Sequence, residues 1–334
     1  MSTVLVGAGV MPQSDPLLAL VPLPHRAVFH PYGFPVSVAS NSPMVLKAAW
    51  KSWAGLPRRF ETPPLELRCV VTQGAASDCP PPPVARAQRN LTVWVADAEN
   101  YWCCDLATGF ASAWVTGRVA ANTRYLRYHV LEGMAYSLLG SLHMVTLHAA
   151  CVALDGHGVL LAGDSGAGKS SLAYACARRG WAYISDDSSS LLRRSGTRAV
   201  LGDPRLFRFR ATAGALFPEF QGMEESPHAQ GKPTVEVRTS SLPAIRSAVE
   251  SRVDAVVFLN RRDGRVGQAE LLPVAWDDAM ERLSYSPWPA DLPTVGERQS
   301  TLERLAGAEA YEMRYRDLDA AADKLEQIVR GGRG

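Results

Sequence analysis

The stretch of sequence that decides the fold reads Gly163, Asp164, Ser165, Gly166, Ala167, Gly168, Lys169 and Ser170. It fits the pattern G-x-x-x-x-G-K-[ST], in which glycines let backbone N–H groups turn toward phosphate oxygens. An apolar run at residues 159–162 precedes it, and a helix-compatible run at residues 171–179 follows. Strand, loop and helix in this order predict a phosphate site at a helix N-terminus, with Lys169 on the outer phosphates and Ser170 on Mg²⁺. The alternative is a chance glycine-rich turn.

Two adjacent carboxylates, Asp186 and Asp187, follow a predicted second strand at residues 181–184. Carboxylates at a strand end beside a nucleotide site suit Mg²⁺ binding and proton abstraction. The alternative is an ordinary Asx turn. Upstream, His148 is separated from the loop by a strand–turn–strand unit, with residues 155–158 as the hairpin turn. A purely structural histidine is the alternative there.

These motifs, together with Arg179-Gly180, resemble in order and spacing the catalytic domain of HPr kinase/phosphorylase. The chain is most similar to the wider group of HPr-kinase-related proteins, which includes kinases that modify peptide precursors. The resemblance covers roughly residues 120–275. It implies an α/β fold with a P-loop kinase core of the HPr kinase/phosphoenolpyruvate carboxykinase type, preceded by a smaller β-rich N-terminal domain.

The resemblance also implies roles for single residues, with ATP and Mg²⁺ as the cofactors. The loop residues 163–170 and Ser171 would bind the triphosphate, and Lys169 would neutralise its charge. Asp186 would hold Mg²⁺ together with Ser170, Asp187 would accept the proton of the acceptor hydroxyl, and His148 would orient that base. The sequence leaves open which of the two aspartates is the base.

Two departures from the family's pattern limit what the resemblance implies. Ser171 stands where the true HPr enzymes carry Glu, and residues 202–210 replace an acidic, glycine-rich signature that is tied to phosphorylase activity. We therefore predict an ATP-dependent kinase that phosphorylates a hydroxyl, foremost a Ser of a peptide or protein, without efficient phosphorylase activity. A small-molecule kinase and a nucleotide-binding regulatory protein without phosphotransfer are the alternatives.

The remaining chain is predicted in two parts. Residues 1–118 form the β-rich N-terminal domain, with strands at 65–71, 91–95, 101–104 and 113–115. Residues 119–330 form the catalytic domain, with helices at 120–139, 277–283, 296–305 and 318–329 and a late central strand at 253–259. The irregular stretch at residues 210–235 predicts a mobile lid in which Lys232 contacts phosphate. A solvated loop lysine is the alternative.

Composition narrows the classes of partner and compartment. A length of 334 residues with 47% hydrophobic content predicts about two globular domains. A net charge of +2 argues against a general nucleic-acid binder.

No uninterrupted apolar run reaches ~18 residues, so we expect no membrane span and a cytoplasmic location. The expected partner is a peptide, protein or small-molecule hydroxyl acceptor, and a homo-oligomer is left open. The six cysteines contain no CxxC pair and predict reduced thiols rather than a zinc site.

Overall fold

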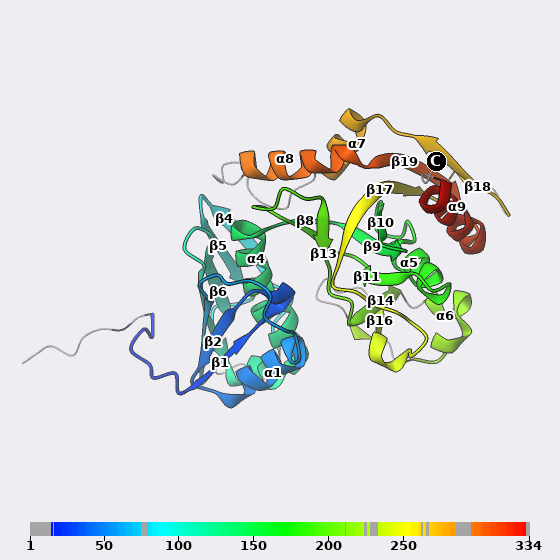
Figure 1. Cartoon of the computed structure of the whole chain (residues 1–334). Helices are drawn as coiled ribbons and strands as arrows, with labels where there is room; N and C mark the ends of the chain where they lie inside the picture. The colour runs from blue at the N-terminus through cyan, green and yellow to red at the C-terminus, as the bar shows by residue number, and fades with distance from the viewer. Residues whose placement is uncertain are drawn as a thin grey trace, which may run out of the picture.

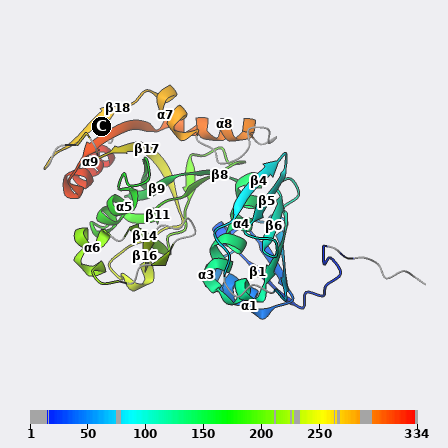
Figure 2. The same cartoon turned by 180° about the vertical axis from the view of Figure 1, so that it is seen from behind.

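The structure is a computed structural model. It describes residues 15, 17–74, 79–210, 212–223, 226–227, 233–261, 263–264, 267–284 and 295–331. Within these residues the fold is mixed α/β with three sheets, which confirms the predicted α/β class. The N-terminal sheet lies to one side of the larger C-terminal sheet, and the two are joined by the segment around β8 (Figures 1 and 2). None of the helices in the described ranges has the length and hydropathy that crossing a bilayer needs.

The N-terminal sheet has seven strands in the order β1-β2-β3-β7-β6-β5-β4. The strands are β1 (His25–Phe29), β2 (Val36–Ser40), β3 (Leu65–Thr72), β7 (Phe110–Thr116), β6 (Tyr101–Asp105), β5 (Leu91–Val95) and β4 (Val84–Gln88). The four strands predicted from alternation, β3, β5, β6 and β7, are therefore confirmed. Burial alternates at the start of β3, whereas β7 is buried at every position after Phe110, so this part of the sheet supplies the apolar surface that helices cover.

Helices cover one face of this sheet. α1 (Pro43–Trp53) and the helical run α2 (Gly117–Ala121), α3 (Thr123–Tyr125), η2 (Leu126–Glu132) and α4 (Gly133–Leu142) share one apolar core with the strands. The predicted helix at 120–139 is thus present, interrupted by the π-helical turn η2. It packs on the N-terminal sheet, and the predicted domain boundary at residues 118/119 stays a prediction.

The larger sheet has nine strands. Seven follow the order β11-β9-β10-β17-β13-β12-β8, and β19 pairs with both β17 and β18. The strands of the seven-strand path are β11 (Ala182–Ser185), β9 (Ala149–Leu154), β10 (His157–Ala162), β17 (Glu250–Asn260), β13 (Ala199–Leu201), β12 (Ser189–Leu192) and β8 (Met144–Leu147). The other two are β19 (Glu309–Tyr315) and β18 (Ala269–Pro273). The predicted late strand, β17, is central and runs parallel to its neighbours β10 and β19. Asp155 and Gly156 both have positive φ and make the tight hairpin turn between β9 and β10 that the sequence predicts.

Two apolar clusters cover the two faces of this sheet. α5 (Lys169–Arg178) and α9 (Leu318–Gly331) pack on one face, next to each other. α7 (Trp276–Leu283) and α8 (Val295–Glu303) contribute buried side chains to the other face, followed by the turn η5 (Arg304–Gly307). Burial on both faces explains why the central strands read as unbroken apolar runs.

A small third sheet, in the order β14-β16-β15, lies beside α5. Its strands are Leu206–Arg210, Pro233–Arg238 and Ser226–Pro227, with α6 (Ala213–Leu216), η3 (Pro218–Phe220) and η4 (Thr239–Ser241) around it. Phe217 and Phe220 are each 3% exposed and pack with Tyr174 of α5. Ala213, Phe217 and Phe220 therefore anchor this segment in the core, whereas Leu216 is exposed. That the stretch moves as a lid stays a prediction. Lys232 lies outside the described residues.

Candidate active site

The phosphate-binding loop connects the end of β10 to the start of α5, as the sequence predicts. Gly166 and Gly168 have φ values of +94° and +99°, which side chains rarely tolerate. At Gly168 a Cβ atom would also lie 2.4 Å from the hydroxyl of Tyr315. That hydroxyl donates a hydrogen bond of 2.8 Å to the carbonyl of Ala167. Strand β19 therefore fixes the loop from outside, and only glycine fits at the residue that precedes Lys169.

Lys169 is buried and points back into the loop. Its Nζ donates to the carbonyl of Gly163 at 2.7 Å and lies 3.0 Å from Nε2 of His148. Burial lowers the pKa of Lys169, and the charge of nearby Asp187 works in the opposite direction. The ammonium is thus held at the loop by neutral acceptors that a phosphate oxygen can replace.

His148 connects Lys169 to one of the two aspartates. An ammonium group only donates hydrogen bonds, so Nε2 of His148 is the acceptor and the ring proton sits on Nδ1. Nδ1 in turn lies 3.3 Å from Oδ1 of Asp187. The three side chains therefore form a chain of contacts, Lys169–His148–Asp187. The contact with Lys169 makes Nε2 of His148 an acceptor, which leaves its Nδ1–H facing Asp187.

The two aspartates occupy different environments. Asp186 is 4% exposed, and its Oδ2 accepts a hydrogen bond of 2.6 Å from the backbone N–H of Arg208. Burial raises the pKa of Asp186 to about 7, and the Arg208 charge opposes that shift. The Asp187 side chain is 57% exposed and faces the open site. The neighbours thus divide into one buried and one accessible carboxylate.

These groups border a cavity of about 450 Å³. Its lining comes from the loop and the start of α5, from β14, α6 and β16, and from the segments after β8, β11 and β17. The lining residues are His148, Ser165, Gly166, Gly168, Lys169, Ser170, Ser171, Asp187, Arg208, Phe209, Arg210, Thr212, Ala213, Leu216, Thr234 and Arg261. Four of these side chains are cations and one is a carboxylate, so the cavity has the electrostatic character of a site for a polyanion.

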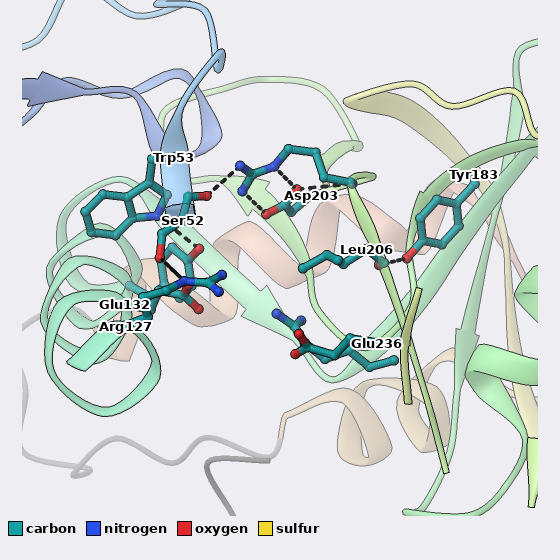
Figure 3. A network of polar contacts seen from close by, with 11 residues as sticks. Ser52, Trp53, Arg127, Glu132, Tyr183, Asp203, Leu206 and Glu236 are labelled. Carbon is teal, nitrogen blue, oxygen red and sulfur yellow. Dashed lines mark hydrogen bonds and ion pairs between the residues drawn. The ribbon is translucent and has the colours of Figure 1, made fainter. Parts of the chain in front are cut away.

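A polar network ties the helices on the N-terminal sheet to β14 (Figure 3). Ser52 of α1 donates to the buried carboxylate of Glu132 at 2.7 Å, and its carbonyl accepts from Arg205 at 2.5 Å. The hydroxyl of Tyr128 in η2 donates to Glu236 of β16. Glu236 also pairs with Arg208, whose guanidinium lies 5.7 Å from the Tyr128 ring centre. The N-terminal part therefore contacts the strand that borders the cavity.

The donor set fits a Mg²⁺ ion that arrives with a nucleotide. Ser170 and Asp187 line the cavity, and buried Asp186 is hydrogen-bonded to the backbone of the lining residue Arg208. Within the described ranges, no cluster of three or more His, Cys, Asp or Glu side chains could hold a metal by itself. Mg²⁺ is usually bound by one or two carboxylates together with substrate phosphates and water. The hydroxyl and carboxylate oxygens of Ser170, Asp186 and Asp187 are therefore enough as protein ligands.

Of the predicted site residues, the cavity is lined by His148, Ser165, Gly166, Gly168, Lys169, Ser170, Ser171 and Asp187. The predicted loop residues Gly163, Asp164 and Ala167 do not line it. Asp186 is buried and does not line the cavity, but it accepts a hydrogen bond from the backbone of Arg208, which does. The sequence analysis missed Arg208, Arg210, Arg261 and Tyr315. Alternation in the run Phe207-Arg208-Phe209-Arg210, apolar then charged, was the available signal for a strand with a charged face.

Comparisons with known proteins address the same segment. Residues 142–208 match the family model described as the HPr Serine kinase C-terminal domain. Among solved structures, the Hpr(Ser) kinase/phosphatase from Coxiella burnetii is similar with 13% identity and a TM-score of 0.31, over 56% of this chain and 90% of that chain. A search of curated proteins gives no significant match. The resemblance drawn from the motifs is thereby confirmed: residues 142–208, which contain the loop, His148 and both aspartates, are HPr-kinase-like.

Proposed function

We propose that the protein is an ATP-dependent phosphotransferase that moves the γ-phosphoryl group to a hydroxyl, foremost a Ser of a peptide or protein. The observation that carries the proposal is the chain Lys169–His148–Asp187 at the mouth of a phosphate-binding loop. A loop alone would serve any nucleotide-binding protein. An accessible carboxylate aligned with the loop lysine adds a proton acceptor at the place where a γ-phosphate would lie.

The proposed chemistry needs positioning and charge stabilisation more than covalent catalysis. The backbone N–H groups of the loop and the start of α5 bind the β- and γ-phosphates. Lys169 exchanges its carbonyl partners for phosphate oxygens and keeps its contact with Nε2 of His148. A bound Mg²⁺ supplies further neutralisation of the phosphate charge, with Ser170 and Asp186 as the residues that would hold it.

Proton transfer falls to Asp187. The acceptor oxygen forms a bond to the γ-phosphorus, the bond from that phosphorus to the bridging oxygen breaks, and ADP leaves with the electron pair. The hydroxyl proton passes to the Asp187 carboxylate. His148, neutral and protonated on Nδ1, donates to that carboxylate and keeps it directed at the cavity. Positioned general-base help of this kind contributes ~10²–10⁴-fold in rate.

A serine acceptor is supported by the description of the family that residues 142–208 match. Asp187 is exposed at the cavity mouth, where a side chain presented on a peptide or a protein loop can reach it. Ser171 replaces the glutamate of the true HPr enzymes, so we propose an acceptor other than HPr itself.

The test is transfer of label from γ-labelled ATP with Mg²⁺ to an array of Ser-containing peptides, with HPr protein and small alcohols as separate arms. We expect acid-stable label on serine peptides, lost in Asp187→Asn. Label only on small alcohols would point to a small-molecule kinase. Nucleotide binding with no labelled product in any arm would contradict phosphotransfer and leave a nucleotide-binding regulator.

A further inference from the structure

Strand β14 presents two arginines to the cavity. Phe207 and Phe209 alternate with them and are 0% and 2% exposed in the core beneath. Arg208 and Arg210 therefore project from the opposite face of the strand, and both line the cavity. The strand is held in place by five paired positions with β16. The two guanidinium groups are thus mounted on a regular element that faces the phosphate-binding loop.

The two arginines differ in their partners. Arg208 pairs with the carboxylate of Glu236. Burial acts to lower the pKa of Arg208, but the nearby charges, Asp186 and Glu132 first, outweigh burial and raise it. Arg210 has no carboxylate within ion-pair distance in the part of the chain that the structure describes. Its Nη2 instead donates to the hydroxyl of Ser165, a residue of the loop, at 2.7 Å. Arg208 is therefore engaged by carboxylates, whereas Arg210, within the described residues, contacts a neutral hydroxyl.

The charge of Arg210 also acts on Lys169. Burial is the main reason that the pKa of Lys169 is lowered, and the charge of Arg210 acts in the same direction. Two cations from different elements thus face one cavity that holds a single carboxylate, Asp187. Two like charges that line one cavity repel each other, and an anion bound between them removes that repulsion. The arrangement is suited to a phosphoryl group contacted from two sides.

We propose that Arg210 is a catalytic residue that contacts the transferred phosphoryl group from the β14 side, opposite Lys169, and stabilises the charge that builds up on it during transfer. This inference rests on the proposed function. The Ser165 hydroxyl is a neutral acceptor, which a phosphate oxygen can replace with a stronger, charge-assisted bond. A guanidinium offers five donors in a planar fork and can bind two phosphoryl oxygens at once.

The expected size of the contribution follows from arginines that act in the same way in other nucleotide enzymes, where they contribute ~10³–10⁵-fold to turnover. Such residues act on the transition state more than on the bound nucleotide. Arg210→Gln should therefore leave ADP affinity nearly unchanged and weaken an analogue of the transferring phosphoryl group. Lysine at this position keeps the charge without the fork, so Arg210→Lys should recover part of the loss.

The experiment measures binding of Mg²⁺·ADP with and without aluminium fluoride by calorimetry, and needs no knowledge of the acceptor. In Arg210→Gln we expect the gain in affinity from aluminium fluoride to fall by ~10²-fold or more, with ADP affinity within about threefold of the wild type. The control is Arg238→Gln on neighbouring β16, which changes an exposed arginine outside the cavity.

The outcomes separate this inference from the proposed function. If the wild type binds Mg²⁺·ADP and gains affinity from aluminium fluoride, but Arg210→Gln gains equally, the role of Arg210 is overturned and the phosphotransferase proposal stands. If the wild type binds ADP with no gain from aluminium fluoride, both are contradicted at the transfer step. If the wild type binds no nucleotide, the proposed function fails and this inference with it.

Discussion

The Nζ atom of Lys169 lies 3.0 Å from Nε2 of His148, so the loop lysine and the upstream histidine share one hydrogen bond. The contact fixes the histidine tautomer, since the ammonium has no lone pair to offer. It also places the opposite ring nitrogen next to Asp187. The phosphate-binding group and the proposed base are thereby linked through one ring.

His148 should act on the rate of transfer and little on nucleotide affinity. His148→Ala removes the donor that keeps Asp187 directed at the cavity, and Lys169 keeps its carbonyl partners in the loop. We expect kcat to fall by about tenfold or more with an almost unchanged KM for ATP. Steady-state kinetics on the labelled-peptide reaction checks this. An increase in the KM for ATP at constant kcat would mean that the histidine serves nucleotide binding instead.

Substitutions of the two aspartates should have different effects on the reaction. Asp187→Asn keeps the shape and removes the proton acceptor, so transfer should fall by ~10²-fold or more while ATP binding is retained. Asp186→Asn keeps an oxygen for the Arg208 N–H and should mainly change the Mg²⁺ concentration needed for activity. Titrating Mg²⁺ against both variants distinguishes the two roles. Full activity of both variants would show that the two aspartates have only a structural role in a turn.

The reverse, phosphate-dependent reaction should be absent. Where the resembling bifunctional enzymes have an acidic signature, this chain has Arg205, Arg208 and Arg210. Arg205 is bound by the Asp203 carboxylate and the Ser52 carbonyl, which gives this segment a structural task. Incubating phosphorylated product with inorganic phosphate and enzyme should release no pyrophosphate above background in a coupled assay. Rapid release would place the chain with the bifunctional enzymes.

Glu132 makes the stability of the protein depend on pH. Burial raises its pKa above the ordinary 4.5, although Arg208, Ser52 and Arg127 oppose this. Between 4.5 and the raised value the native state binds more protons than the unfolded state, so this group's contribution to stability is full below pH 4.5 and declines as pH rises. Glu132→Gln keeps an acceptor for Ser52 and removes the titration.

The free energy of unfolding of Glu132→Gln relative to the wild type should therefore rise from pH 4.5 to pH 8. Urea denaturation of both proteins at several pH values, without nucleotide or Mg²⁺, measures it. A difference that stays constant across this range, or that moves in favour of the wild type at high pH, would show that the ion pairs outweigh burial.

Local sequence signals account for much of the larger sheet and of the site. The apolar run before the loop predicts β10, and the glycine pattern predicts the loop itself, because each depends on neighbouring residues alone. Helix α1 was missed although Ser42 caps it and Pro43 occupies its first turn, a combination that favours a helix start. Strand β19 was missed because its burial comes from pairing with β17 and β18, which are distant in sequence.

The division of labour between Asp186 and Asp187 was not predictable for a related reason. Adjacent residues at a strand end point in different directions, so one carboxylate is buried when the other faces solvent. Which one is buried depends on the register of β14, whose Arg208 N–H binds Asp186. The same strand brings Arg210 to the loop, a contact between residues 45 positions apart. Distant contacts of this kind leave no local pattern in the sequence.

The most direct test of the account is calorimetric titration of the wild type and Lys169→Ala with ATP in the presence of Mg²⁺. We expect one ATP site per chain in the wild type and a loss of affinity of about tenfold or more in the variant, since one charge-assisted bond to phosphate contributes ~1.5–3 kcal/mol. Equal unfolding curves for the two proteins would show that the fold is intact. Equal ATP affinity in both proteins, or no binding by the wild type, would contradict the claim that residues 163–170 form a working nucleotide site.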